Sequence, residues 1–190
     1  MTTGRLEAFS DGVLAIIITI MVLDLKVPEG YSLAVLKSLF PKFLSYIFSF
    51  IYVGIYWNNH HHLFQAIEKV NGKVLLANLN LLFWISLLPF TTGWMGENHF
   101  ENIPVALYGL ILLMCAISFA ILGRTAIRFE GRESLISTSI SSQWKEKISV
   151  IGYIAGISMA FFYPIAGVVI LYAVALLWLI PDTRIEKRVQ

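Results

Sequence analysis

The feature that most constrains this chain is a series of long apolar segments separated by short charged ones. A helix needs about 20 mostly apolar residues to cross about 30 Å of hydrocarbon. Of the 190 residues, 57% are apolar and 14% are charged; a soluble domain is usually about 45–50% apolar and about 25% charged. This surplus of apolar side chains is too large for one protein core. We therefore predict an all-α integral membrane protein that lies in a lipid bilayer.

The apolar segments predict six membrane-spanning helices in a single domain over residues 1–190. The last segment, Ile148–Ile180, has no charged residue and would be about 50 Å long as one helix. That is too long for one straight span, so we divide it at Tyr163-Pro164. The predicted spans are residues 7–25, 39–59, 74–95, 102–123, 148–162 and 164–180.

The distribution of lysine and arginine supports six spans over five. Cytoplasmic loops of membrane proteins are enriched in these two residues. With six spans, eleven of the 14 basic residues lie on the side of the two termini, and only Lys26, Lys37 and Lys42 lie on the other side. We therefore expect both termini in the cytoplasm.

Two acidic residues, both aspartates, lie within the first predicted span. Only Gly12–Leu23 separates Asp11 from Asp24, which is about 18 Å of helix and less than the hydrocarbon thickness. At least one of these acids, together with Ser10, must lie at membrane depth or in a polar interior. An ionisable group there is costly and marks a candidate functional site. The alternative is that Ser10 and Asp11 only join helices through hydrogen bonds.

The helical phase of this span separates an apolar face from Asp11. At about 100° per residue, Asp11 points about 140° away from Ile16. If the apolar face lines a pore, Asp11 must pack against other helices of its own subunit. Asn78 is either a further interhelical hydrogen-bonding group or a loop residue. The apolar face consists of Gly12, Ile16, Thr19, Ile20 and Leu23, and the expected partners of Asp11 are Trp57, His60, His61 and Asn80.

Three consecutive histidines, His60–His62, allow two further interpretations. Consecutive helical residues point in different directions, and no cysteine or second histidine cluster completes a site. We therefore predict no bound metal and no cofactor. Because imidazole titrates near neutral pH, Asp11 and His60–His62 could instead serve a proton-coupled carrier. Against a carrier, the chain lacks paired broken helices and a recognisable substrate site.

Other functions find little support in the sequence. It contains no Ser/His/Asp set, no metal set and no phosphate-binding glycine loop, so we predict that the protein is not an enzyme and takes no small-molecule substrate. A scaffold is compatible with a plain six-span bundle. The net charge of +2 gives no indication of nucleic-acid binding. The potassium filter sequence T-V-G-Y-G is absent, so ion selectivity would need another origin.

Several short motifs resemble those of a known family. The first is R-x-x-x-F-S-D-G, formed by Arg5, Phe9, Ser10, Asp11 and Gly12. The second is W-x-x-H-H-x-x-F, formed by Trp57, His60, His61 and Phe64. The third is N-L-L followed by P-F-x-T, formed by Asn80 and residues 89–92. In this order they resemble prokaryotic members of the transmembrane protein 175 family of potassium channels.

The resemblance implies a homotetramer in a bacterial cell membrane, with six helices per subunit. The first helices would line a central pore for K⁺ without a carbonyl filter. Apolar side chains would form its constrictions at Ile16, at Thr19 or Ile20, and at Leu23, with K⁺ passing near the Thr19 hydroxyls. The motif residues that would hold this helix in place are Arg5, Phe9, Ser10 and Asp11, packed against Trp57, His60, His61 and Asn80.

Overall fold

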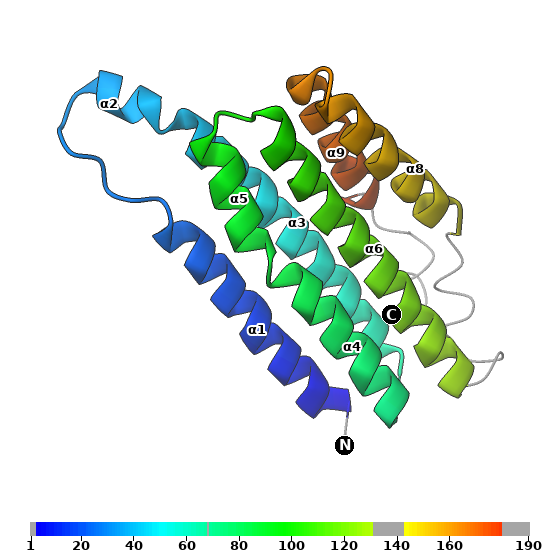
Figure 1. The fold of residues 1–190 in the computed structure, drawn as a ribbon. Helices are drawn as coiled ribbons and strands as arrows, with labels where there is room; N and C mark the ends of the chain where they lie inside the picture. Colours follow the sequence, from blue (N-terminus) through cyan, green and yellow to red (C-terminus); the bar gives the residue numbers. More distant parts are fainter. Residues whose placement is uncertain (1–2, 68, 131–142, 180–190) are drawn as a thin grey trace.

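The computed structural model describes residues 3–67, 69–130 and 143–179, which form helices and no β-strand (Figure 1). Each helix is rich in apolar residues. In chain order they are α1 (Thr3–Leu23), α2 (Leu33–Ser38), α3 (Phe40–Gln65), α4 (Gly72–Ile85), α5 (Leu88–Glu97), α6 (Asn102–Glu130), α8 (Gln143–Ala160) and α9 (Pro164–Leu179).

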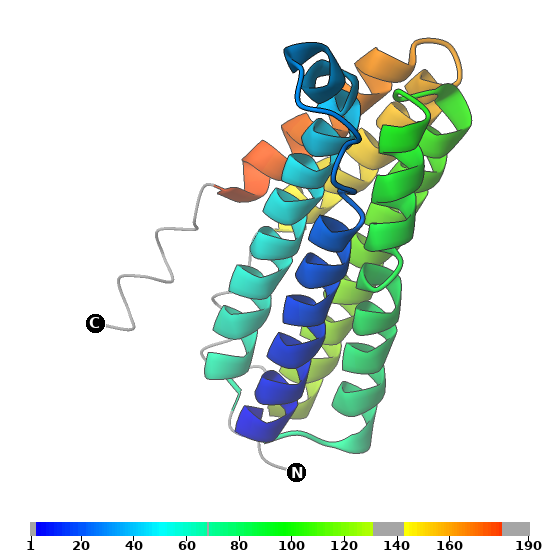
Figure 2. The same ribbon diagram turned by 90° about the vertical axis from the view of Figure 1, so that its left-hand side faces the viewer.

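The long helices form an up-and-down bundle in which successive passes alternate in direction (Figures 1 and 2). The amino terminus lies at the same end of the bundle as the turn between α3 and α4. Helix α1 lies at the edge of the bundle and packs against α3, α4 and α5. Helices α8 and α9 form a hairpin that packs mainly on α6. The short α2 extends away from the bundle at the other end (Figure 1).

Three segments of the described residues are long and apolar enough to cross a membrane, namely Thr3–Leu23, Gly72–Glu97 and Asn102–Phe129. Pro164–Leu179 is apolar but shorter. Helix α3 has 26 residues, but serines, tyrosines and a polar last part lower its apolar character. The protein is thus a membrane protein whose described residues form a helical bundle.

Two prolines mark the places where predicted apolar segments break. The third predicted span is divided, since α4 ends at Ile85 and α5 begins at Leu88 with Pro89 in its first turn. In the last segment, α8 ends at Ala160 and α9 begins at Pro164, next to the predicted division at Tyr163-Pro164. Proline fixes φ and has no N–H to donate, so a helix tolerates it only near its start.

Helix ends differ from the predicted span limits where polar residues continue a helix. Helix α3 extends to Gln65 instead of residue 59, and α6 to Glu130 instead of residue 123. The helix α2 was not predicted. The basic residues Arg132, Arg184, Lys187 and Arg188, and Ile180 at the predicted end of the last span, lie outside the described residues.

Glycine allows the backbones of α8 and α9 to touch. A Cβ atom added to Gly167 would lie 2.8 Å from the carbonyl oxygen of Gly156 and 3.0 Å from the Cα atom of Ala160. Both obstacles include backbone atoms, which cannot rotate away as a side chain can. Small residues at helix crossings permit this close packing in membranes.

Replacing Gly167 with alanine should therefore destabilise the protein by about 1–3 kcal/mol, the usual cost of overpacking. Gly54→Ala in α3 is the matched control, because an added Cβ there meets no atom within 4 Å. The control should be neutral or slightly stabilising, since alanine favours helix over glycine. Thermal unfolding of the purified protein in detergent measures both. Equal midpoints for the two variants would contradict the close approach.

Candidate pore helix and its polar anchor

Helix α1 buries one narrow face against its own subunit. The buried residues follow one another at intervals of three or four, as expected for one side of a helix. This face meets α3, α4 and α5. Its members are Leu6, Ser10, Leu14, Ile17 and Met21.

The opposite face of α1 is apolar and is covered by no other described helix of the chain (Figure 2). Ile16 is 58% exposed, Ile20 48% and Leu23 77%. Phe9, two turns before Ile16, is exposed by half on the same side. A continuous exposed apolar stripe indicates a surface that meets a partner, lipid or a channel interior.

Thr19 adds a polar atom to this exposed face. Its hydroxyl donates a hydrogen bond to the carbonyl oxygen of Ile16 over 2.8 Å. The donated hydrogen points back to the helix, which leaves the hydroxyl oxygen free to accept. Thr19 can therefore present oxygen, the atom that K⁺ prefers, to the space beside α1.

A buried hydrogen-bonded chain joins the inner face of α1 to two other helices. The side chains of Ser10, His60 and Asn78 are each at most 1% exposed. The Asn78 amide donates to the Ser10 hydroxyl over 3.0 Å, and Ser10 donates to the Leu6 carbonyl over 2.9 Å. His60 Nε2 lies 2.8 Å from Asn78 Oδ1. We call Ser10, His60 and Asn78 the polar anchor.

The polar anchor indicates the tautomer of His60. Asn78 Oδ1 can only accept, so Nε2 of His60 carries the hydrogen. Among the described residues, Nδ1 of His60 is buried and has no hydrogen-bond partner. A proton there would leave a buried N–H group without an acceptor, which is costly. His60 is therefore neutral in this arrangement.

At the rim of the polar anchor, polar side chains of α3 form hydrogen bonds with the amino-terminal half of α1. The Trp57 indole donates to Asp11 Oδ1 over 3.1 Å. His61 Nδ1 lies 2.6 Å from Glu7 Oε1, and its Nε2 lies 2.8 Å from the Gln65 amide. Glu7 and Gln65 were not predicted, because neither stands out from an ordinary charged or polar helix end. The rim thus attaches α1 to the last turns of α3.

The structure corrects the position of Asn80. Its amide donates to the Ser118 hydroxyl of α6 over 2.7 Å, away from Asp11 and the histidines. Asn78 takes the place that the sequence analysis gave to Asn80. The buried positions of α4, which include Val74, Leu81 and Ile85, put Asn78 on the core face. This periodicity was the available signal.

Arg5 and Phe9 also differ from the expected packing. Both are exposed on the outer side of α1 and do not join the polar anchor. His60 and His61 bond to different partners, Asn78 and Glu7. Within the described residues, no group of three or more His, Cys, Asp or Glu side chains is placed to hold a metal ion.

Comparison with known proteins assigns this arrangement to a class. Residues 5–89 match the family described as endosomal/lysosomal potassium channel TMEM175. A potassium channel of Chryseobacterium sp. (strain P1-3) is 63% identical over 187 residues, which cover 98% of this chain and 97% of the relative. A potassium channel of Streptomyces collinus is 34% identical over 62% of this chain and 61% of its own length.

More distant relatives include a protein of known crystal structure and proteins from animals. The crystal structure of a lysosomal potassium-selective channel TMEM175 homologue from Chamaesiphon minutus matches with a TM-score of 0.81 at 29% identity, over 93% of this chain and 95% of that chain. The human endosomal/lysosomal proton channel TMEM175 is 32% identical over 63% of this chain, which corresponds to only 26% of the human protein.

A helical membrane bundle with these relatives is an ion-channel protein and not an enzyme. Five motif residues lie within the matched region at the polar anchor and its rim, namely Ser10, Asp11, Trp57, His60 and His61. The chain belongs to the TMEM175 family.

From the polar anchor we predict how two substitutions change the stability of the folded protein. Asn78→Leu keeps a similar volume but leaves the N–H of His60 without an acceptor, so we expect a loss of about 1–2 kcal/mol. Asn80→Leu is the control, because it removes one bond at an exposed residue. Thermal unfolding in detergent should show the larger loss for Asn78→Leu. A larger loss of stability for Asn80→Leu would show that Asn78 is not the residue on which the polar anchor depends.

Proposed function

We propose that this chain forms a homotetrameric, K⁺-permeable channel in the bacterial cell membrane, with four α1 helices around a central pore. The observation that carries the proposal is the exposed apolar stripe of α1 opposite the polar anchor. One subunit offers a single such face and cannot enclose a pore by itself. Cyclic symmetry brings the same face of each subunit to one axis.

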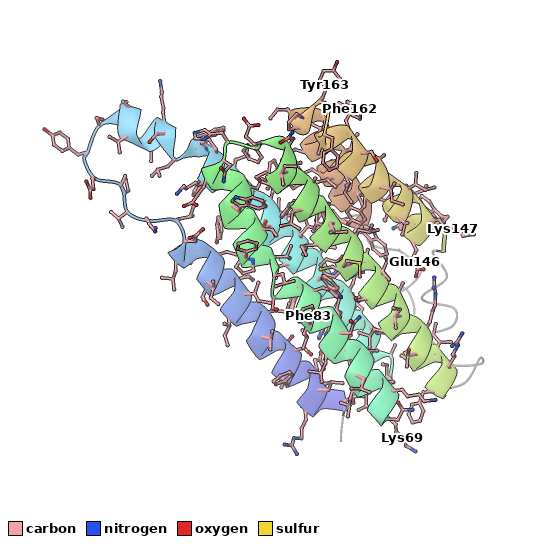
Figure 3. The ribbon with its side chains drawn as sticks, in the orientation of Figure 1. Lys69, Phe83, Glu146, Lys147, Phe162 and Tyr163 are labelled. Atoms are coloured by element: carbon pink, nitrogen blue, oxygen red, sulfur yellow. The ribbon has the colours of Figure 1, made fainter. Side chains whose placement is uncertain are left out.

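The six-span arrangement over residues 1–190 completes this proposal, with both termini in the cytoplasm. The alternating direction of α1, α3, α4–α5, α6, α8 and α9 supports it (Figure 1). Lys69 lies at the same end of the bundle as the amino terminus, and Phe162 and Tyr163 lie at the other end (Figure 3). Basic residues on the cytoplasmic side and aromatic residues at an interface fit this orientation.

In the proposed pore, successive layers of α1 act differently on an ion. A ring of four Ile16 side chains forms a narrow apolar layer, where a pore can close by losing its water. One turn further, Thr19 offers four hydroxyl oxygens to a partly dehydrated K⁺. Ile20 and Leu23 form the outer layers. The permeant K⁺ is the only ion that the proposal requires, and the partner of each subunit is a second copy of the chain.

Replacing Ile16 with asparagine should raise K⁺ conductance and weaken the preference for K⁺ over Na⁺, because a polar ring holds water where an apolar ring excludes it. Ile165→Asn in α9 is the matched control, since Ile165 is likewise exposed (61%) but lies on another helix. Single-channel recording in planar bilayers measures both variants. Wild-type conductance and selectivity in Ile16→Asn would remove this residue from the pore.

A second candidate is a proton-coupled carrier that uses Asp11 and His60–His62. Vertebrate relatives are described as proton channels, and the polar anchor contains a histidine nitrogen without a partner. The channel proposal treats Asp11 as a packing group that accepts from Trp57. An asparagine at this position keeps an acceptor oxygen, whereas it cannot carry a proton.

Asp11→Asn separates these two candidates. The channel proposal expects a folded protein with K⁺ flux close to wild type and no dependence on a proton gradient. The assay uses K⁺-loaded liposomes with a dye for internal pH, and wild-type protein is the control. Loss of flux from a folded variant, together with loss of proton movement in step with K⁺, would favour the carrier.

A further inference from the structure

A cavity of about 600 Å³ lies between α3, α6, α8 and α9, on the side of the bundle away from α1. Its volume falls within the range of about 300–1,000 Å³ that is usual for ligand sites. Tyr56 and Phe119 form part of its wall from α3 and α6, and Tyr153 and Ala175 from α8 and α9. The four helices thus line a mostly apolar space that the channel proposal does not use.

The polar groups in the interior of this cavity are already paired with protein atoms. The Trp178 indole donates to the Ser149 hydroxyl over 2.8 Å. The amide of Asn59 donates to the carbonyl oxygen of Ile55 over 2.8 Å. A polar solute would therefore gain little there and would lose its hydration. The interior suits a hydrocarbon chain.

The mouth of the cavity carries positive charge. Arg124 of α6 and Lys147 of α8 line it together with one carboxylate, Glu146. Arg124 Nη2 donates to Glu146 Oε2 over 2.9 Å, and the Arg124 side chain remains 64% exposed. A guanidinium has five N–H donors, so most of them stay available to an anion. Figure 3 shows Glu146 and Lys147 in the first turn of α8.

An apolar strip on α8 continues from the mouth to the outer surface. Ile151 lines the cavity and is 66% exposed, and Ile148, one turn earlier, is 48% exposed. In a membrane protein such a strip meets lipid. Three surfaces therefore meet at the mouth: the apolar wall of the cavity, an exposed apolar strip and a cationic edge.

We propose that this cavity binds an anionic phospholipid of the bilayer. One acyl chain occupies the cavity, the other lies along Ile148 and Ile151, and the phosphate meets Arg124 and Lys147. Basic pockets between helices near the membrane surface bind anionic head groups in this way. The site depends on the membrane location of the protein and not on the position of the pore.

The first test measures lipid binding by native mass spectrometry of delipidated protein, titrated with phosphatidylglycerol, phosphatidylcholine or oleate. We expect phosphatidylglycerol to bind at least about tenfold more tightly than phosphatidylcholine, because only its head group is a net anion. The double variant Arg124→Gln/Lys147→Gln should lose about tenfold in affinity for phosphatidylglycerol.

The control is Arg128→Gln/Lys73→Gln, which removes two basic residues that do not line the cavity and should keep wild-type affinity. Equal losses in both double variants would show general charge attraction and overturn the site. Binding of oleate without phosphatidylglycerol would overturn the choice of a phospholipid.

The second test locates the acyl chain. A phosphatidylglycerol with a photoreactive group on one chain should label peptides that contain Phe119 or Tyr153. Ala120→Phe should reduce this labelling, because Ala120 lines the cavity, whereas Leu110→Phe, outside it, should not. Thermal unfolding checks that each variant is folded, and the charge variants test the site if Ala120→Phe is not. Labelling confined to α1 would overturn the proposal, and so would labelling that Ala120→Phe does not reduce. Cross-links in the native protein that place residues 180–190 in the cavity would overturn it as well.

Discussion

The hydrogen bonds of Asn78 set the rotation of α1, and the rest of the candidate site depends on that rotation. Ser10 is fully buried, so water cannot replace a missing hydrogen-bond partner there. A turn of α1 by one residue, about 100°, would separate Ser10 from Asn78. The same turn would bring Ile16 towards the core. The polar contact on one face of the helix therefore determines which apolar residues the opposite face presents.

Much of the helical architecture could be predicted from the sequence, because bilayer thickness and the absence of charge leave few alternatives. The break before Pro164 followed from length and from the distribution of basic residues, and the apolar stripe around Ile16 followed from helical phase. The choice between Asn78 and Asn80 did not follow, since it depends on which face of α4 meets α1. The family motif drew attention to Asn80, whereas the periodicity of the buried residues identifies Asn78. The extension of α3 to Gln65 was missed because polar residues end a span without ending a helix.

The two halves of the chain have different structural roles. Residues 5–89, which match the family, contain α1, the polar anchor and its rim. The later helices support this first half by packing: α6 packs against α4 and α5, and the α8–α9 hairpin packs on α6. A buried link crosses between the halves at Ser49, whose hydroxyl lies 2.6 Å from Thr92 and 3.0 Å from the Tyr108 hydroxyl. The part that faces the proposed pore is thus supported by a part that faces lipid.

The break between α4 and α5 has a consequence for the shape of the third pass. Pro89 has no N–H, so it donates no hydrogen bond to the carbonyl group of Ile85, four residues earlier. Proline at such a position is a common cause of a sharp helix kink. Helices α4 and α5 each contact α1, so a kink at this point lets the third pass meet α1 at two different angles.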